Sequence, residues 1–443
     1  MNKTNDPSRL DRSVWLKTAA PSDEFPMLDG EFEADIGIIG GGYTGLSAAL
    51  HLAKSGKKVA LVEAHGPGNG ASGRNAGGYL PVYMDRTPAD VRRIFGDAAG
   101  AGLNQMVAES SQLMLEMVRD YGIEADLRTD AFLMGAHMPG QKGREKLLAI
   151  RNMWIAEGLR IDVMERDAMS DCIGMSSFEV GLRFKDGGTI NPISLARGLA
   201  RAARSEGADI FCKTPAIDLT FKGDSWRITT RDGMLNARNV LIATDGYASE
   251  VALWPALEMT MYHVPVAGVA SKPSPDLSRK LSPRGFALAD DNATSHLYMT
   301  FDSQDRLIGS LLPPWRYSAA AADVARPYEL KLRRIFGDIP AIEWESFWLG
   351  TVGISAERVP RCLRLDSNLH AISGYSGQGI TAAIASGKEY ASFICADNRE
   401  SACRLPFMDP RPVPLRRTLP RVIRHVGAPL IRLTDRTYRS GKR

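Results

Sequence analysis

Cysteine is scarce in this sequence, with five among 443 residues. No two of the cysteines stand at the short spacing that zinc sites use, and their number is odd. We therefore expect reduced thiols in a reducing compartment and no metal site. The cysteines are Cys172, Cys212, Cys362, Cys395 and Cys403.

A long uninterrupted hydrophobic run is also lacking. The nearest candidate, residues 36–53, contains no Lys, Arg, Asp or Glu, but it holds a cluster of glycines and is flanked by charges. A buried strand, a tight turn and a buried helix explain this segment better than a membrane span. The first 25 residues are polar and lack the apolar core of a secretory signal. These absences predict a cytoplasmic protein.

The net charge is small, +4, but it is unevenly distributed. Residues 404–443 alone carry a net charge of +9, and apolar residues recur there at roughly helical spacing, interrupted by Pro420 and Pro429. This basic tail could anchor the protein to a membrane surface or an acidic partner. We favour the simpler alternative, a broken helix packed on the body of the protein. The basic residues are not interleaved with aromatic residues, which argues against a nucleic-acid partner.

The strongest local signal is a glycine motif near the N-terminus. Residues 34–39 form a short apolar run typical of a buried parallel strand, followed by Gly40, Gly42 and Gly45. A helical pattern begins at once and ends near Gly56, and a second strand then ends in Glu63. In such a unit the glycines allow a tight turn and close approach of a pyrophosphate, while the terminal carboxylate accepts hydrogen bonds from a ribose. A merely glycine-rich turn would leave Glu63 unexplained, so we expect dinucleotide binding.

A second glycine-rich segment follows directly, and it reads AHGPGNGASGRNAGGYLP. So many small residues indicate backbone wrapped around a bulky ligand rather than a regular element. Here the sequence resembles the D-amino acid oxidase superfamily of FAD enzymes, and more narrowly its gamma-glutamylputrescine oxidase branch. The resemblance is carried in order by GGGYTGLSAALHLA, GASGRNAGG, DGGTINPISLA, WLGTVGISAERVP and GYSGQGIT, which span about residues 30–400.

The later part of the chain favours FAD over NAD. Segments 208–219, 236–247 and 368–380 are apolar and end in small residues, as strands that lead into a ligand crevice do. An NAD enzyme would not need the far C-terminus to return to its cofactor. By resemblance we expect non-covalent FAD held by Gly40, Gly42, Tyr43, Thr44, Gly45, Glu63, Ala64, Ala71, Ser72, Gly73, Arg74, Asn75, Ala76, Gly77, Gly78, Ala216, Ala243, Thr244, Gly246, Gly350, Gly374, Tyr375, Ser376, Gly377, Gln378, Gly379, Ile380 and Thr381.

The predicted fold class is α/β. A discontinuous Rossmann-like FAD-binding domain, with helices on both sides of a largely parallel sheet, would comprise residues 30–86, 157–256 and 343–400. A second, α+β substrate-binding domain built on an antiparallel sheet would comprise residues 87–156 and 257–342. It would include helices at 97–121 and 321–336 and strands within 260–270 and 295–310. Residues 1–29 are read as an extension and 401–443 as the basic tail.

The sequence contains no signature of nucleophilic catalysis, neither G-x-S-x-G nor a Cys with a persuasive His partner. The resemblance implies an enzyme that oxidises the C–N bond of an amine or gamma-glutamylated amine. Hydride would pass to flavin, the imine would hydrolyse to an aldehyde plus ammonia or amine, and dioxygen or another acceptor would reoxidise the flavin. Three alternatives stay open: a D-amino acid, glycine or sarcosine oxidase or dehydrogenase, a membrane-surface dehydrogenase that reduces quinone, and a flavin-binding protein without turnover.

Candidate catalytic residues come from segments that the family directs toward the flavin ring. They are Gln378, Tyr375, His263, Tyr298 and Trp348, with Tyr262, Trp315 and His296 as further pocket candidates. Each aromatic residue could equally lie in the core, and a structural histidine is the simpler reading of His263 and His296. If the substrate carries a carboxylate, Arg358 or Arg361 could bind it through two parallel hydrogen bonds.

Gln378 is the most informative of these residues. It lies in GYSGQGIT, where many relatives read GYSGHG, and a helix is expected to start near Gly379 with its N-terminus toward the flavin. An amide can donate and accept hydrogen bonds but does not take up a proton near neutral pH. Any pH dependence caused by that histidine should therefore be absent here.

Overall fold

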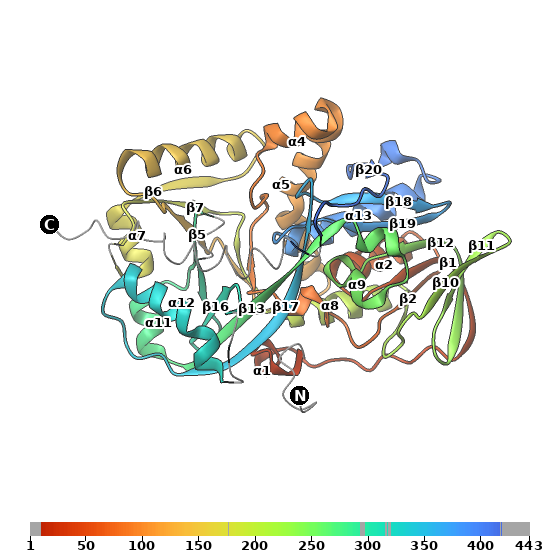
Figure 1. The fold of residues 1–443 in the computed structure, drawn as a ribbon, viewed down its shortest axis with the longest axis horizontal. Coiled ribbons are helices and arrows are strands. Elements are labelled where there is room, and N and C mark those ends of the chain that lie inside the picture. The colour runs from red at the N-terminus through yellow and green to blue at the C-terminus, as the bar shows by residue number, and fades with distance from the viewer. Residues whose placement is uncertain are drawn as a thin grey trace.

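The structure is a computed structural model that describes residues 10–175, 177–292, 297–314, 317, 320–416 and 418. Two large sheets organise it: a nine-stranded sheet on the right of Figure 1 and an eight-stranded sheet on the left. A small third sheet joins β3 (Gly78–Tyr79), β8 (Gly188–Thr189) and β4 (Arg128–Thr129). The predicted combination of an α/β domain and a second domain with a largely antiparallel sheet is confirmed.

The nine-stranded sheet has a parallel centre built around β1 (Gly30–Ile39). This strand pairs in parallel with β2 (Val59–Val62) on one side and β12 (Gly233–Ile242) on the other. Beyond them, β9 (Asp209–Phe211) pairs with β2 and β19 (Leu369–Ser373) pairs with β12, also in parallel. The buried end of β1 and the whole of β2 are apolar, and β19 is fully buried, as expected for a sheet covered on both faces. Antiparallel strands β18 (Arg361–Asp366), β10 (Asp218–Lys222) and β11 (Ser225–Thr229), and the parallel edge strand β20 (Phe407–Met408), complete the sheet.

Long helices cover one face of this sheet. The helices α2 (Tyr43–Lys54) and α13 (Ile380–Cys395) pack side by side, flanked by α8 (Pro192–Ser205) and α5 (Asp97–Asp120). The contact between α2 and α13 is close because Gly387 lacks a side chain: a Cβ there would lie 2.5 Å from the carbonyl oxygen of Thr44. The other face carries the β10–β11 hairpin and two short helices, α9 (Ala248–Val251) and α10 (Pro255–Glu258), so that helices lie on both sides of the sheet.

The eight-stranded sheet has the order β17-β13-β16-β15-β14-β5-β7-β6. Its pairs are antiparallel except for β14 with β5. The two longest strands, β13 and β17, run from this sheet toward the first one across the middle of Figure 1. The strands are β17 (Trp344–Ser355), β13 (Met261–Pro273), β16 (Arg306–Leu311), β15 (Tyr298–Phe301), β14 (Ala287–Asp290), β5 (Phe132–Gly135), β7 (Val180–Phe184) and β6 (Ile161–Glu165).

Helix α12 (Ala321–Phe336) buries an apolar stripe against the eight-stranded sheet and agrees with the predicted helix at 321–336. The predicted helix at 97–121 is α5. Helices α4 and α5 stand at the top of Figure 1, with α6 beside them, whereas α1 lies at the bottom. The remaining elements are η2 (Leu10–Arg12), α1 (Trp15–Thr18), α3 (Ala71–Arg74), α4 (Pro88–Phe95), α6 (Gly140–Ile155), α7 (Arg166–Ile173), η3 (Asp245–Tyr247), α11 (Pro275–Leu281) and η4 (Glu400–Ala402).

One predicted strand is wrong in extent, and one predicted strand region is confirmed. The strand expected over 208–219 ends at Phe211, because Lys213 adopts a left-handed backbone and Pro215 has no N–H to offer a neighbouring strand. The run 295–310 contains two strands, β15 and β16, joined by a turn in which Asp302 accepts hydrogen bonds from the amides of Gln304 and Arg306.

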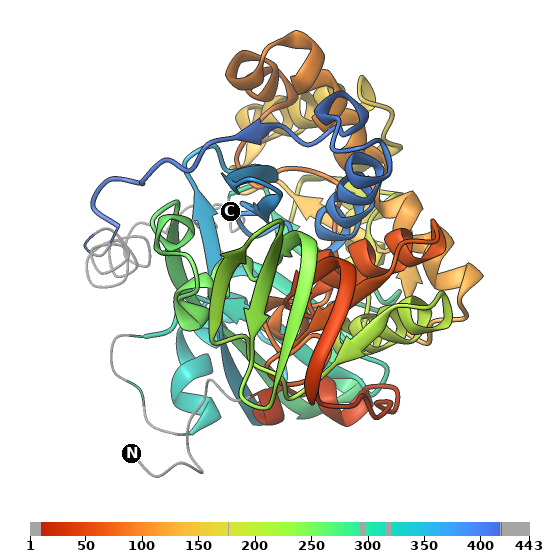
Figure 2. The ribbon, with the colours of Figure 1, turned by 90° about the vertical axis from the view of Figure 1, so that its right-hand side faces the viewer.

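Sheet membership also differs from the predicted domain ranges. Strands β6 and β7 lie within 157–256, and β17 lies within 343–400, yet all three belong to the eight-stranded sheet. The domain boundaries therefore stay a prediction. If domains are assigned by sheet, β6, β7 and β17 belong to the second domain rather than to the FAD-binding domain. Figure 2 shows the molecule from the side of the first sheet, with β1 beside β12 at the front.

The beginning of the basic tail lies against the body of the protein. Val413 is buried and donates its amide to the carbonyl of Met259 at 2.9 Å, and Arg416 forms an ion pair with Glu258 at 2.6 Å. The tail residues from 419 onward, and with them the predicted broken helix, lie outside the described residues. Within the part of the chain that is described, no helix is long and apolar enough to cross a membrane, and no cluster of His, Cys, Asp or Glu is suited to a metal ion.

Candidate functional site

The first glycine loop, residues 40–45, connects β1 to α2 and has no room for side chains. A Cβ on Gly45 would lie 2.0 Å from the carbonyl oxygen of Gly40. Gly40 has a φ of +112°, and a Cβ there would lie 3.0 Å from the carbonyl oxygen of Ala243 at the end of β12. The glycines thus allow α2 to pack closely on β1, as predicted. The N-terminal amides of α2 lie beside backbone that carries no side chains.

Glu63 is fixed at the end of β2 by two backbone amides. Its Oε2 accepts from Gly41 at 2.7 Å and its Oε1 accepts from His65 at 2.9 Å. Desolvation raises the pKa of Glu63, and these two hydrogen bonds oppose that rise. A carboxylate has about four acceptor positions, so Glu63 can still accept from ribose hydroxyls. Gly41 occupies one of the variable positions of the G-x-G-x-x-G motif and was not among the predicted site residues. A Cβ there would lie 3.0 Å from the Glu63 Cγ.

Residues 71–78 form a compact segment rather than an irregular loop. It begins with the one-turn helix α3, and the Asn75 side chain then bridges the carbonyl of Ser72 and the amide of Gly77, at 2.8 and 2.9 Å. Ser72 Oγ accepts from the Tyr43 amide at 3.0 Å, which ties the segment to the start of α2. This segment and the first glycine loop therefore lie together.

Two buried indoles support the same segment. Trp348 on β17 donates its Nε1–H to the carbonyl of Arg74, and Trp15 donates to the carbonyl of Asn75, each at 2.9 Å. Trp348 is fully buried and has used its only polar group in this contact. In this conformation it supports the 71–78 segment from a fully buried position, which weighs against the predicted catalytic role.

The second glycine loop, residues 374–379, connects β19 to α13. The helix begins at Ile380, as predicted, and the loop has left-handed backbone at Gly374, Ser376 and Gly377. The Tyr375 hydroxyl lies 2.6 Å from Thr44 Oγ1 in the first helical turn of α2. The two glycine loops, more than three hundred residues apart in the sequence, thus meet through this buried hydrogen bond, and the N-termini of α2 and α13 lie together.

Several polar atoms near these loops are buried and have no hydrogen-bond partner among the described residues. They include Thr244 Oγ1, just beyond β12, His263 Nε2 on β13 and Ser373 Oγ at the end of β19. The other ring nitrogen of His263 lies 2.9 Å from the carbonyl oxygen of Gly246. Buried polar groups normally have partners. A bound dinucleotide would explain this arrangement. It would offer partners to the unpaired polar atoms, contact the glycine backbone and donate to the Glu63 carboxylate.

The eight-stranded sheet contributes Tyr298 to this region. Its ring lies against Gly78, where a Cβ would lie 2.4 Å from the Tyr298 hydroxyl, and burial raises the pKa of that hydroxyl. Tyr262 donates its hydroxyl to the carbonyl of Pro414 at 2.9 Å, so it contacts the start of the tail. Trp315 and His296 lie outside the described residues.

The two candidate carboxylate-binding arginines are already engaged. Arg358 forms an ion pair with Asp85. Arg361 is buried, forms an ion pair with Glu357 at 2.9 Å and donates to the carbonyl of Thr260 at 3.1 Å. Each guanidinium already has a carboxylate partner in this conformation.

Most of the other predicted cofactor residues lie in or beside the glycine loops, and one lies farther away. Gln378 and Gly379 are half-buried in the second glycine loop. Gly350 lies on β17, where a Cβ would lie 3.2 Å from the Arg74 Cβ. Ala64 and Ala76 are half-buried next to the first strands, and Ala243 closes β12. Ala216 lies farther out, in the connection between β9 and β10. The contacts predicted with FAD stay predictions for all of them.

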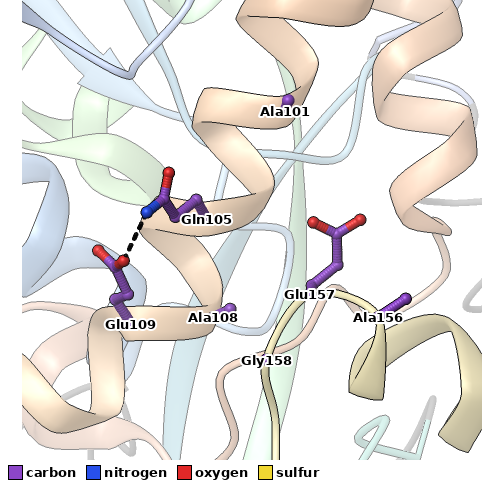
Figure 3. A pocket seen from close by; sticks show the side chains of 7 residues that line it. All are labelled: Ala101, Gln105, Ala108, Glu109, Ala156, Glu157 and Gly158. Carbon is purple, nitrogen blue, oxygen red and sulfur yellow. Dashed lines mark hydrogen bonds between the residues drawn. The ribbon is translucent and has the colours of Figure 1, made fainter.

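A separate surface hollow lies between α5 and the turn after α6 (Figure 3). Its two acidic side chains, Glu109 and Glu157, are paired with Arg404 at 2.6 Å and Arg92 at 2.7 Å. No residue of either glycine loop lines it, so we do not regard it as the functional site. It is lined by Ala101, Gln105, Ala108, Glu109, Ala156, Glu157 and Gly158.

Comparison with known proteins agrees with this geometry. The family described as "FAD dependent oxidoreductase" (DAO) matches residues 35–393. The sequence is 30% identical to "Probable oxidoreductase OrdL" of Rhizobium meliloti, over 87% of this chain and 89% of that protein. It is 27% identical to "Gamma-glutamylputrescine oxidoreductase" of Escherichia coli, over 96% of this chain and 98% of that protein.

Solved structures show the same fold. Glycine oxidase from Geobacillus kaustophilus superposes with a TM-score of 0.64 at 20% identity, over 82% of this chain and 95% of that one. L-proline dehydrogenase from P. horikoshii superposes with a TM-score of 0.67 at 16% identity, over 86% and 98% of the two chains. The matched region includes both glycine loops, and the protein is therefore an FAD-dependent oxidoreductase of the DAO family.

Proposed function

We propose that this enzyme oxidises the C–N bond of a primary or secondary amine, with a gamma-glutamylated amine as the preferred substrate class. The observation that carries the proposal is the meeting of the two glycine loops at the Thr44–Tyr375 hydrogen bond. This contact places two helix N-termini, a fixed carboxylate and bare backbone beside the strands of the second sheet. The similarity to the gamma-glutamylputrescine oxidoreductase over nearly the full length supports the substrate class.

Bound FAD would supply the hydride-accepting ring, which is chemistry that no side chain provides. The first glycine loop and Glu63 would hold the dinucleotide, and the 71–78 segment and the second glycine loop would bind its flavin portion. The amides at the start of α13 would stabilise negative charge near the ring. The protein must then orient a substrate C–H bond toward the ring and keep water away from it.

Oxidation of a neutral amine at this site would not require a side chain that acts as a general base. A neutral amine needs no side chain to accept a proton before it gives up hydride, and Gln378 does not ionise near neutral pH. The imine product would be hydrolysed to an aldehyde plus ammonia or amine. Dioxygen is the proposed electron acceptor, and formation of hydrogen peroxide would show it.

The state of the two arginines bears on the choice between amines and amino acids. Arg358 and Arg361 already form ion pairs with Asp85 and Glu357, so an α-carboxylate would have to compete with those carboxylates for them. This favours an amine without a carboxylate on the reacting carbon over a D-amino acid, glycine or sarcosine. The two substrate classes would be oxidised by enzymes of the same fold, so the choice between them depends on the substrate pocket.

A panel of reductants tests the proposal. The holoenzyme is mixed anaerobically with gamma-glutamylputrescine, putrescine, glycine, sarcosine or D-alanine, and fading of the visible flavin absorbance is followed. We expect the gamma-glutamyl amine to reduce the flavin fastest. Faster reduction by sarcosine or D-alanine would assign the enzyme to the amino acid oxidases instead.

A further inference from the structure

We propose that Asp245 is a positioning residue that holds the second glycine loop in the conformation that receives FAD. Asp245 lies in η3, the turn that follows β12. It belongs to neither glycine loop, and the sequence motifs do not point to it. The inference rests on the proposed placement of the flavin portion at the second glycine loop, but it does not depend on which amine is oxidised.

The contact that carries the proposal joins Asp245 to the first residue of that loop. Asp245 Oδ1 accepts a hydrogen bond from the Gly374 amide at 2.9 Å, across 129 residues of sequence. The carbonyl of Gly374 accepts from Ser376 Oγ at 3.1 Å. Both backbone groups of Gly374 are thus held by side chains at the point where β19 ends.

Only glycine fits at position 374. Its φ is +99°, and a Cβ there would lie 2.6 Å from the carbonyl oxygen of Val359 and 2.9 Å from Arg361 Nη1. Since the residue has no side chain, its backbone hydrogen bonds are the polar contacts that hold the direction in which the loop leaves the sheet.

Asp245 itself is kept in an unfavourable state. Its φ of +38° is left-handed, and desolvation raises the pKa of its carboxyl group despite opposing hydrogen bonds from Gly374 and Gly246 and the nearby Arg361 and His263. Strained backbone and desolvated carboxylates persist where the surroundings hold them, and they gather at functional sites. Arg361 is fixed by Glu357 and Thr260, so the positive charge near Asp245 is itself immobile.

Two substitutions separate the hydrogen bond from the backbone conformation. Asp245→Gly tolerates the positive φ but removes the acceptor, whereas Asp245→Asn tolerates it and keeps an acceptor oxygen. The full-length apoprotein is titrated with FAD, and quenching of flavin fluorescence gives the dissociation constant. We expect Asp245→Gly to weaken FAD binding about tenfold and Asp245→Asn to stay within about threefold of the unmodified protein. The visible spectrum of bound flavin should change in the glycine variant.

Glu250→Gln is the matched control, since Glu250 is exposed on the neighbouring α9 and should leave FAD affinity unchanged. Unaltered FAD affinity in Asp245→Gly would overturn the proposal. So would a lower resistance to denaturant with normal affinity in the folded fraction, because the role would then be structural only. Failure of every amine to reduce the flavin, with the affinity difference intact, would count against the proposed substrate and not against Asp245.

Discussion

Single glycines decide whether the dinucleotide site can form. Gly45 is the strictest case, because a Cβ there would lie 2.0 Å from the carbonyl oxygen of Gly40. To remove this steric clash, α2 would have to move away from β1. We expect Gly45→Ala to lower the free energy of unfolding by at least about 2 kcal/mol and to abolish FAD binding.

Gly66→Ala is the control for this substitution. Gly66 lies in the connection after β2, its φ is not positive, and a Cβ there would meet no atom within 4 Å. Denaturant unfolding and FAD titration of the two variants compare them directly. Equal behaviour of both would show that the crowding at Gly45 has no consequence.

The Thr44–Tyr375 pair links the two glycine loops through a hydrogen bond between side chains. Thr44→Val or Tyr375→Phe removes the hydrogen bond, and because the pair is buried each change should cost about 1 kcal/mol in the free energy of unfolding. In a double-mutant cycle the second change should cost about 1 kcal/mol less in the background of the first. Strictly additive losses would show that the two hydroxyls are not coupled.

At the scale of elements, β19 carries a histidine that makes folding sensitive to acid. His370 lies among the rings of Tyr390, Phe393 and Phe407, and burial lowers its pKa to about 4. Below pH 6.5 the unfolded chain takes up a proton that the folded protein refuses until about pH 4. His370 should therefore contribute a loss of about 3 kcal/mol in the free energy of unfolding across this interval, and no further loss below it.

His370→Leu should flatten that part of the pH profile. The raised pKa values of Glu63 and Asp245 act in the opposite direction, since those carboxyls take up protons more readily when folded, but they are the same in both proteins. Denaturant midpoints measured between pH 4 and pH 7 give the comparison. Identical slopes in the two proteins would contradict the assignment to His370.

At the scale of the whole molecule, local patterns predicted the units that are contiguous in sequence. The strand, glycine turn and helix at 34–54 and the helix after Gly379 were predicted, because apolar spacing and glycines record them directly. The break after Phe211 was missed because apolar content outweighed Pro215 in that segment. The reach of β13 and β17 toward the first sheet depends on tertiary packing, which no local pattern records.

The site was predicted less completely than the fold. Glu63 and the glycines follow a known spacing, whereas Asp245 meets Gly374 only across 129 residues of sequence. The engagement of Arg358 by Asp85 likewise joins distant segments, and it could not be read from an arginine-rich loop. Long-range hydrogen bonds and ion pairs are therefore what the structure adds.

The central claim is that an amine reduces a flavin held where the two glycine loops meet. Its most direct test is the anaerobic addition of gamma-glutamylputrescine to the holoenzyme while the visible absorbance is recorded. We predict that the yellow colour fades and returns when dioxygen is admitted, and that Gly45→Ala protein shows no such band. A flavin band that persists with every amine in the panel would contradict the account.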